Sequence, residues 1–196
     1  DIIFICVGTP NKKGFQSVDL KYVFNSIRDI AKITKQKKII VTKSTVPVGT
    51  GDDIEKLLKR VRNSKFEVIS NPEFLREGEA IRDFRYPDRV VIGSNNKKIF
   101  KVMKKLYQPI INKGAKFFTT SRRGAELIKY ASNAFLATKI TFINEISNLC
   151  EKSNIDVEDI SLGMGSDTRI GSRFLRAGPA YGGSCFPKDT RGLVST

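Results

Sequence analysis

The chain has 196 residues, of which 40% are hydrophobic and 28% are charged, a composition typical of a globular protein and not of a disordered one. No apolar run approaches the roughly 18 residues that a membrane-spanning helix needs. The sequence contains 0 His, which excludes Ser-His-Asp and Cys-His hydrolases and the usual His-ligated zinc sites. Any catalysis must therefore use Cys, Lys, Asp, Glu or bound water.

The formal net charge of +15 has more than one interpretation. A lysine-rich solvated surface is favoured, anionic small molecules come second, and nucleic acid comes last, because the sequence has no arginine-rich or aromatic-interleaved basic motif. Cys6, Cys150 and Cys185 make no metal-like or redox-like pair, and the N-terminus does not resemble a signal peptide. We therefore expect a cytoplasmic protein with no metal, no nucleic-acid partner and no membrane.

The first 120 residues alternate short apolar runs with stretches of helical spacing. In chain order, the pattern predicts a strand at 2–7, a helix at 18–34, a strand at 38–42, a helix at 52–61, a strand at 66–69, a short helix at 73–81, a strand at 89–92, a helix at 97–107 and a strand at 116–118. This order is typical of a parallel sheet with helices on both faces.

The pattern changes after residue 120. Residues 121–152 form one long helical stretch, and a helix of about 30 residues spans about 45 Å, which suits a connector or the spine of a dimer. A short helix is predicted at 154–160. Residues 163–192 are rich in Gly, Ser and Arg and predict a long loop region, which is usually functional.

Three turns follow predicted strands: Gly-Thr-Pro at 8–10, Ser-Thr-Val-Pro at 44–47 and Asn-Pro-Glu at 71–73. Ligands of parallel sheets lie at the carboxyl ends of the strands, so these turns indicate one edge of a site. The hydroxyl of Thr45 could hold a water there, although Thr45 could equally be a simple turn residue.

The most informative run is Gly-Gly-Ser-Cys-Phe-Pro-Lys-Asp at 182–189. Pro187 suits the first position of a helix, and a helix N-terminus together with Lys188 would stabilise a thiolate at Cys185. Asp189 lies four residues further on, where it could hold a water or receive a proton. The alternative is a structural cysteine in a turn, which the surrounding residues disfavour.

Two further pairs stand four residues apart. Lys129 and Asn133 share one face of the long helix among apolar neighbours, where both could donate to an oxyanion, unless that face is solvated. Glu73 and Glu77 stand at the start of the predicted helix at 73–81. They either complement the helix dipole or place carboxylates beside a substrate and a cofactor.

The remaining observations concern one loop and two cysteines. The loop at 174–178, Phe-Leu-Arg-Ala-Gly, precedes Cys185 and could bind a base or phosphate through its amides and Arg176, or could be a flexible surface loop. Cys6 and Cys150 are expected to be buried core thiols.

Five runs, in this order, resemble the UDP-glucose/GDP-mannose dehydrogenase family and, within it, the UDP-glucose branch. They are Val-Gly-Thr-Pro at 7–10, Lys-Ser-Thr-Val-Pro-Val-Gly at 43–49, Asn-Pro-Glu-Phe-Leu-Arg-Glu-Gly at 71–78, the stretch at 126–133, and the cysteine run at 182–189. The resemblance implies an α/β fold with a partial doubly wound Rossmann-like domain at 1–120. The long helix and the cysteine loop of an α-helical central domain follow at 121–196.

The resemblance also implies an activity, the oxidation of the C6 hydroxyl of UDP-glucose to a carboxylate with two NAD+ and one water. Cys185 would form a thiohemiacetal with the intermediate aldehyde and then a thioester that water hydrolyses. Lys129 and Asn133 match the pair that stabilises the oxyanion, and Asp189, with a water near Thr45, matches the acid/base system. Glu73 matches the acid linked to thioester hydrolysis.

Binding roles are implied in the same way. The positions that match NAD contacts are Thr9, Thr45, Glu77 and Lys188. The positions that match sugar-nucleotide contacts are Glu73, Phe74, Leu75, Arg76, Glu77, Lys129, Asn133, Phe174, Leu175, Arg176, Ala177, Gly178 and Gly182. A homodimer through the long helix is also implied.

Some features of the family have no match in these residues. The glycine-rich first βαβ unit and the C-terminal domain that completes the UDP site are both missing, and Ala180 stands where the family commonly has Gly. We therefore expect these 196 residues by themselves to be inactive. Two alternatives stay open: a UDP-N-acetyl-sugar or GDP-mannose dehydrogenase, and a catalytically dead remnant that dimerises or binds nucleotides.

Overall fold

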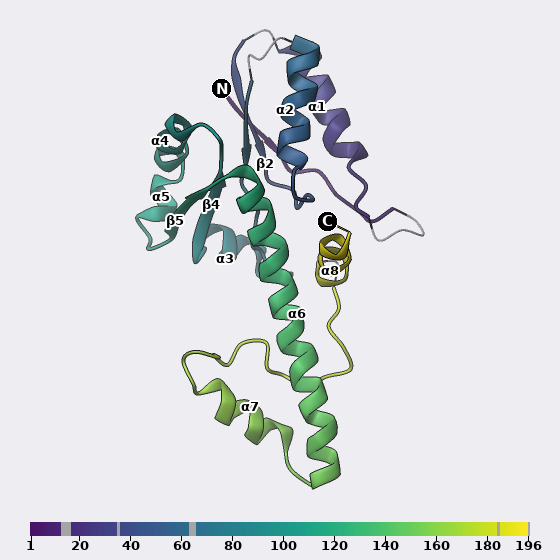
Figure 1. Cartoon of the computed structure of the whole chain (residues 1–196). Helices are drawn as coiled ribbons and strands as arrows, with labels where there is room; N and C mark the ends of the chain where they lie inside the picture. The colour runs from purple at the N-terminus through teal and green to yellow at the C-terminus, as the bar shows by residue number, and fades with distance from the viewer. Residues whose placement is uncertain (13–16, 35, 63–65, 184, 196) are drawn as a thin grey trace. The chain divides into compact units, whose positions relative to one another are not determined.

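A computed structural model of the chain describes residues 1–12, 17–34, 36–62, 66–183 and 185–195. The chain divides into two compact units, Asp1–Lys129 with Val194–Thr196, and Tyr130–Leu193. The boundary between the two units falls inside one continuous helix, α6 (Arg122–Ser153), drawn in green in Figure 1. The predicted long helix at 121–152 is therefore confirmed to within a residue at each end.

The first unit is built around a five-stranded sheet with the strand order β1-β2-β3-β4-β5. Its strands are β1 (Ile2–Ile5), β2 (Lys38–Thr42), β3 (Phe66–Ser70), β4 (Arg89–Gly93) and β5 (Lys116–Thr120). The first three strands run parallel to one another, and β4 runs parallel to β5. Each predicted strand is present. Each corresponds to a short apolar run bounded by turn residues, the pattern that predicts a buried strand.

Helices cover both faces of this sheet (Figure 1). One face packs against α1 (Lys21–Ile33) and α2 (Thr50–Arg62), and the other against α4 (Lys97–Leu106) and α5 (Gln108–Ile111). Side chains along a strand alternate between faces. Accordingly Ile40 belongs to the core under α1 and α2, and Val41 belongs to the core under α4 and α5. The short helix α5 is an addition to the predicted elements.

The sheet is mixed, which corrects the prediction of a parallel sheet. β3 and β4 meet antiparallel at the pair Ser70↔Gly93. Their connection contains α3 (Ala80–Arg85), and none of the residues of α3 is buried. Because α3 buries no face against the sheet, it does not act as the crossover helix that would bring the chain back for a parallel strand.

The end of β4 also fixes where α6 begins. A Cβ atom added at Gly93 would lie 2.6 Å from the Cβ of Ala125 and 2.7 Å from the backbone oxygen of Ser121. The first turn of α6 therefore lies directly against the backbone of β4. Arg122, on the same turn, is buried and forms ion pairs with Asp52 at 2.7 Å and Glu55 at 2.8 Å, both on α2.

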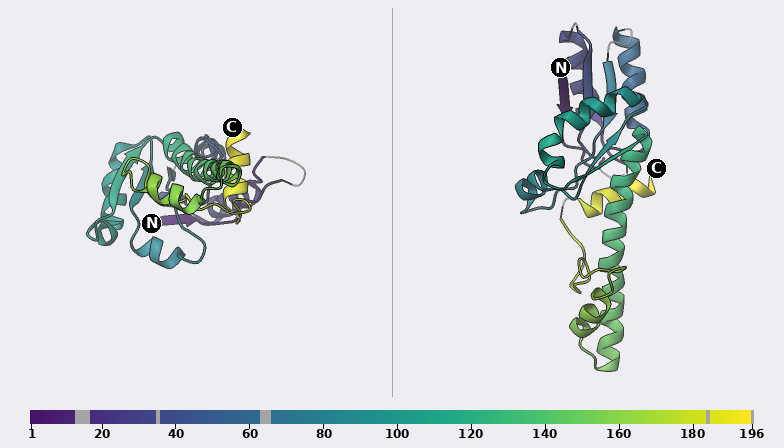
Figure 2. Two further views of the ribbon diagram at one scale, coloured as in Figure 1. Left: turned by 90° about the horizontal axis from the view of Figure 1, so that it is seen from below. Right: turned by 90° about the vertical axis from the view of Figure 1, so that its left-hand side faces the viewer.

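The second unit contains the rest of α6 followed by α7 (Val157–Gly165) and α8 (Phe186–Val194). The chain turns back after α6 at Asn154, which has a φ of 54°, so that α7 lies beside the last turns of α6 (Figures 1 and 2). α7 begins at Val157 and not at 154, because the Asp156 carboxylate accepts a hydrogen bond from the Glu158 N–H and caps the helix. None of the helices in the described part of the chain is long and apolar enough to cross a membrane.

Candidate active site

The three turns predicted to form one edge of a site do lie together at the carboxyl ends of β1, β2 and β3. The Thr9 hydroxyl donates a hydrogen bond of 2.8 Å to the Thr45 backbone oxygen, and both residues are buried. The Ser44 hydroxyl donates to the Val7 backbone oxygen at 2.6 Å. The backbone N–H of Asn71 donates to the Thr42 oxygen at 2.9 Å. Hydrogen bonds across the turns therefore fix this edge.

A buried carboxylate holds the Thr45 turn against α6. Glu126 accepts hydrogen bonds from the backbone N–H groups of Gly49 at 2.7 Å and Gly51 at 2.9 Å, and from the Ser70 hydroxyl at 2.8 Å. Burial raises the pKa of Glu126, and the three donors oppose that rise. Glu126 thus joins the starts of α2 and α6 and the end of β3 one turn before Lys129.

Glu73 and Lys129 form an ion pair in the first unit. The Lys129 amine lies 3.3 Å from one Glu73 oxygen, and the other Glu73 oxygen accepts a 2.6 Å hydrogen bond from the Leu75 N–H. Lys129 is 2% exposed, which rules out the alternative that it lies on a solvated face. Its partner on the helix, Asn133, is also buried and belongs to the second unit.

The segment at 73–79 is not the predicted helix, which begins only at Ala80. Gly78 has a φ of +82°, a left-handed conformation that an α-helix does not contain. Glu73 and Glu77 therefore lie on a turn before α3, and the interpretation that they complement its dipole is wrong.

The aromatic ring of the same segment contacts two cations. The Arg89 guanidinium lies 3.9 Å and the Lys129 amine 5.4 Å from the centre of the Phe74 ring. The Arg76 guanidinium is held by Asp83 at 2.6 Å, while Glu77 is exposed.

Cys185 and Asp189 are brought together at the start of α8 in the second unit. Cys185 directly precedes α8, as predicted, and its backbone oxygen accepts a 2.8 Å hydrogen bond from the Asp189 N–H. Asp189 is 1% exposed, and its two carboxylate oxygens accept hydrogen bonds from Asn133 at 2.6 Å and from Lys188 at 2.5 Å. A buried carboxylate with two donors thus lies one turn from a partly exposed thiol.

The loop at 174–178 is anchored within the second unit. The Leu175 backbone oxygen accepts from Ser161 at 2.7 Å, and the Gly178 N–H donates to Asn144 at 2.9 Å. Phe174 has a φ of 65°, a left-handed conformation, and its ring meets the edge of Phe186 with 6.0 Å between centroids. Leu175 is buried, Ala177 is partly buried, and Arg176, Gly178 and Gly182 are exposed.

The other two cysteines differ from one another. Cys150 is buried, as predicted. The prediction for Cys6 is wrong, because β1 ends at Ile5 and Cys6 is exposed on the turn that follows. Among the residues that the structure describes, no group of three His, Cys, Asp or Glu side chains could hold a metal ion.

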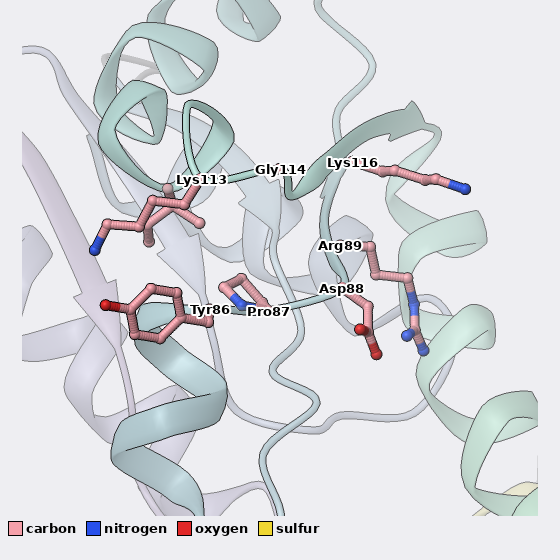
Figure 3. Close-up of a pocket in the computed structure, with 8 residues that line it drawn as sticks. Tyr86, Pro87, Asp88, Arg89, Lys113, Gly114 and Lys116 are labelled. Carbon is pink, nitrogen blue, oxygen red and sulfur yellow. The ribbon is translucent and has the colours of Figure 1, made fainter.

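A pocket in the first unit lies between the start of β4 and the end of α5 (Figure 3). Its lining includes Arg89, Lys113 and Lys116, which suggests an anion site. Figure 3 shows Lys113 and Lys116 extending in opposite directions, while Lys113 covers the ring of Tyr86 at 4.6 Å. Since these cations do not converge on one point, we assign the pocket no function.

The backbone of the turn after β1 is open at Gly8. A Cβ atom added at Gly8 would meet nothing within 4 Å, so the backbone at this edge is open. Dinucleotides bind outside the carboxyl ends of such strands. The open backbone at Gly8 is therefore compatible with a dinucleotide at this edge.

The fold is of the α/β class, and the comparisons with known proteins name the family. Residues 1–111 match the NAD binding domain and residues 123–196 the central domain of the UDP-glucose/GDP-mannose dehydrogenase family. Together these matches cover most of the chain, which therefore belongs to that family.

Individual relatives agree with this assignment. The chain is 54% identical to a UDP-glucose 6-dehydrogenase of Rhizobium meliloti (strain 1021), with 100% of the chain and 46% of that protein covered. It is 52% identical to a UDP-glucose 6-dehydrogenase of Rickettsia prowazekii, with 98% of the chain and 44% of that protein covered. The structure of a UDP-glucose dehydrogenase from Pyrobaculum islandicum superposes with a TM-score of 0.93 at 40% identity, over 100% of this chain and 45% of that one. The chain thus spans less than half the length of these relatives.

Proposed function

We propose that the chain is part of an enzyme that oxidises UDP-glucose to UDP-glucuronate with NAD+. The observation that carries this proposal is the arrangement at the start of α8. There a partly exposed thiol precedes a helix whose first turn contains a buried carboxylate held by Asn133 and Lys188. That arrangement suits covalent catalysis on a carbonyl followed by hydrolysis. The names of the relatives support the choice of substrate.

Cys185 is the nucleophile of the proposed reaction. Its thiolate adds to the aldehyde carbon and forms a thiohemiacetal, and loss of a hydride and a proton then gives a thioester. Water attacks the thioester and releases the carboxylate and the thiol. A bound NAD+ would supply the hydride acceptor for each oxidation, and we assign Thr9, Thr45 and Glu77 to hold it at the carboxyl edge of the sheet. The N-terminus of α8 favours the thiolate, since backbone N–H groups point outward at that end of a helix.

The other proposed catalytic residues transfer protons or stabilise negative charge. We assign Asp189 to proton transfer in the second unit, with Asn133 and Lys188 fixing its orientation. Lys129 and Asn133 stabilise the oxyanion, and each already donates to a carboxylate, Glu73 and Asp189 respectively. Glu73 assists thioester hydrolysis, and Thr45 holds a water at the carboxyl edge. The segment from Glu73 to Glu77 and the loop at 174–178 bind the nucleotide sugar, with Gly182.

We also propose that the protein is a homodimer through α6. Phe135, Phe142 and Leu149 recur every seven residues on this helix and are 64%, 46% and 59% exposed. A seven-residue repeat places apolar side chains on one stripe of a helix, the usual pattern of helix pairing. A second copy of the chain would cover that stripe.

The domain boundary and the compartment follow from two further observations. We place the boundary between the cofactor domain and the central domain at residue 120, where β5 ends and α6 follows within two residues. We propose a cytoplasmic enzyme, because Cys6 and Cys150 are free thiols and a reducing compartment keeps thiols in that state.

A chimera tests the proposed activity. These 196 residues replace the matching segment of the Rhizobium meliloti enzyme, and NADH formation is followed with UDP-glucose, GDP-mannose and a UDP-N-acetyl-sugar. We expect steady oxidation of UDP-glucose, lost in Cys185→Ser because a serine alkoxide is far harder to form at neutral pH. Cys150→Ala removes a different thiol and should retain the activity. Wild-type turnover by Cys185→Ser would remove this residue from the nucleophile role.

The 196-residue chain alone is expected to form no NADH. The cofactor pyrophosphate normally rests on a glycine-rich loop and helix N-terminus that these residues do not supply. Each lost charge-assisted hydrogen bond weakens binding by roughly 1.5–3 kcal/mol. NADH production by the chain alone, abolished by Cys185→Ser, would contradict this expectation.

A further inference from the structure

The segment between α7 and α8 returns along α6 and is attached to it by two side chains that no role proposed above uses (Figure 1). The Lys139 amine donates hydrogen bonds to the backbone oxygens of Ile170 at 2.9 Å and Gly171 at 3.1 Å. Asn144, five residues further along α6, accepts a 2.9 Å hydrogen bond from the Gly178 N–H through its side-chain oxygen. Both ends of the segment are therefore attached to one helix.

The two attachments close the segment into a loop. Residues 170–178, called the clamped loop below, begin and end at positions of α6 that lie about 7.5 Å apart along the helix axis, given a rise of 1.5 Å per residue. Compact surface loops whose ends lie close together are frequently functional. The clamped loop contains the stretch 174–178 to which we assign binding of the nucleotide sugar.

The middle of the clamped loop packs against α7. Leu175 is 3% exposed, and its backbone oxygen accepts the hydrogen bond from the Ser161 hydroxyl. At the end of α7, a Cβ atom added at Gly165 would lie 2.8 Å from the Cα of Ser172, so the helix and the loop meet at backbone distance. Packing therefore fixes the middle of the loop, and the hydrogen bonds to α6 fix its two ends.

The backbone of the clamped loop is strained. Gly171 has a φ of 70° and Phe174 a φ of 65°, and for a residue with a side chain this left-handed conformation is unfavourable. Such conformations persist only where the surrounding contacts over-determine them, and they cluster at binding sites. The hydrogen bonds from the charged Lys139 amine, which are stronger than neutral ones, lie at the start of this strained stretch. A loop without a role would gain more from a relaxed backbone and a hydrated lysine.

We propose that Lys139 and Asn144 are positioning residues for the nucleotide sugar, which hold the clamped loop in the conformation that binds it. The inference rests on the proposed function, in which the stretch 174–178 contacts the nucleotide sugar. Lys139 and Asn144 act through the backbone of the loop. Their loss should weaken the binding of UDP-glucose and spare that of NAD+, because the NAD+ contacts assigned above belong to the first unit.

The first experiment measures the loop in the 196-residue protein. The chain is digested briefly with trypsin under native conditions, and cleavage after the exposed Arg173 and Arg176 is quantified by mass spectrometry. Cleavage should be about tenfold to a hundredfold faster in Lys139→Met and about threefold to tenfold faster in Asn144→Ala, because proteolysis tracks the population of the opened loop. Lys139→Arg should restore most of the resistance, since a guanidinium group can also donate to two oxygens.

The controls are two exposed positions on the same helix. Lys152→Met and Asn148→Ala repeat the chemical changes without removing a contact to the loop, and both should be cleaved like the wild type. Cleavage after Lys101 on α4 is the internal reference for unfolding. Equal loop cleavage in all variants, or no rescue by arginine, would overturn the inference. If Lys139→Met does not fold, as judged by circular dichroism, the result for Asn144→Ala decides alone.

The second experiment separates KM from kcat in the chimera. Lys139→Met should raise the KM for UDP-glucose about threefold to tenfold, with a smaller change in kcat and an unchanged KM for NAD+. Surface loops open at little free-energy cost, so a tenfold shift leaves few molecules in the binding conformation, and the apparent affinity falls with their fraction. Lys139→Arg should return the KM for UDP-glucose toward the wild-type value.

General damage to the protein would give a different pattern of constants. Equal increases in KM for both substrates, or a lower kcat with both KM values unchanged, would refute the positioning role. A wild-type KM for UDP-glucose in both Lys139→Met and Asn144→Ala would also refute it. A chimera that oxidises none of the nucleotide sugars would instead refute the proposed function, and the proteolysis result would then decide the attachment of the loop by itself.

Discussion

The ring of Tyr130 occupies the space that a side chain at Gly192 would need. A Cβ atom added at Gly192 would lie 2.8 Å from Cε1 and 3.1 Å from the hydroxyl oxygen of Tyr130, whose side chain is fully buried. Both residues belong to the second unit. α8 therefore approaches α6 to backbone distance, which places Asp189 within reach of the Asn133 amide.

Gly192→Ala should destabilise the second unit by about 1–3 kcal/mol, because an added methyl group in a filled space forces the surrounding side chains to move. Urea unfolding followed by circular dichroism measures the loss. Gly163→Ala is the control, since a Cβ atom there meets nothing within 4 Å and alanine favours the helix. Equal stability of the two variants would mean that α8 can move away from Tyr130 at no cost.

Glu126→Gln should destabilise the first unit by about 1–3 kcal/mol. The two carboxylate oxygens of Glu126 accept hydrogen bonds from the N–H groups of Gly49 and Gly51. A glutamine has only one side-chain oxygen, so its NH2 group would face one of these two N–H donors and leave it without an acceptor. The unfolding midpoint in urea measures the effect. Glu145→Gln, at an exposed position on the same helix, should leave the midpoint unchanged. A similar small effect for both would argue that the three donors of Glu126 are readily satisfied by water.

The contact between Arg76 and Asp83 should make the segment before α3 sensitive to acid. The hydrogen bonds from Arg76 hold the pKa of Asp83 below its usual range. A lowered pKa in the folded state means that the stabilisation is present above the ordinary value of about 3.9 and is lost as the pH falls through the folded value. Hydrogen exchange at the Arg76 amide, corrected for its intrinsic rate, should therefore increase in acid.

Two Asp→Asn variants test whether the acid sensitivity comes from the Asp83 carboxylate. Asp83→Asn should show fast exchange at the Arg76 amide at every pH, because the amide N–H itself donates to Asp83. Asp29→Asn, which removes an exposed carboxylate on α1, should behave like the wild type. Slow exchange at the Arg76 amide in Asp83→Asn would show that other contacts hold the segment.

Removal of the apolar stripe on α6 should give a monomer. We expect the chain to sediment as a dimer at tens of micromolar. The triple variant Phe135→Gln, Phe142→Gln and Leu149→Gln should sediment as a monomer, since it removes the surface that the second copy buries. Leu162→Gln, at a residue 71% exposed on α7, is the control and should not change the mass. A monomeric wild-type chain would refute the proposed interface.

The sequence predicts most of the elements because hydrophobic spacing is a local signal. The strands and α6 are long or sharply bounded, and their positions agree with the prediction within a few residues. The predicted helix at Glu73 fails for a local reason that spacing does not reveal. Gly78 adopts a positive φ, and the Glu73 carboxylate accepts a hydrogen bond from the Leu75 N–H of its own turn.

The site was predictable only in part, since several of its properties depend on residues far apart in the chain. The burial of Lys129 and Asp189 follows from packing between elements and not from their neighbours in sequence.

The close approach of α6 to Gly93 has a consequence for which substitutions this protein can accept. No positive φ is involved, so the restriction comes from the Cβ of Ala125 and from two backbone atoms, the Ser121 oxygen and the Arg122 Cα. Gly49 differs, because its φ of +95° penalises side chains while the space around it is open, a setting that asparagine tolerates best. In a saturation mutagenesis screen, position 49 should therefore accept Asn, whereas position 93 should accept only Gly, because two of the three close atoms belong to the backbone of α6 and its preceding residue and no side-chain substitution removes them.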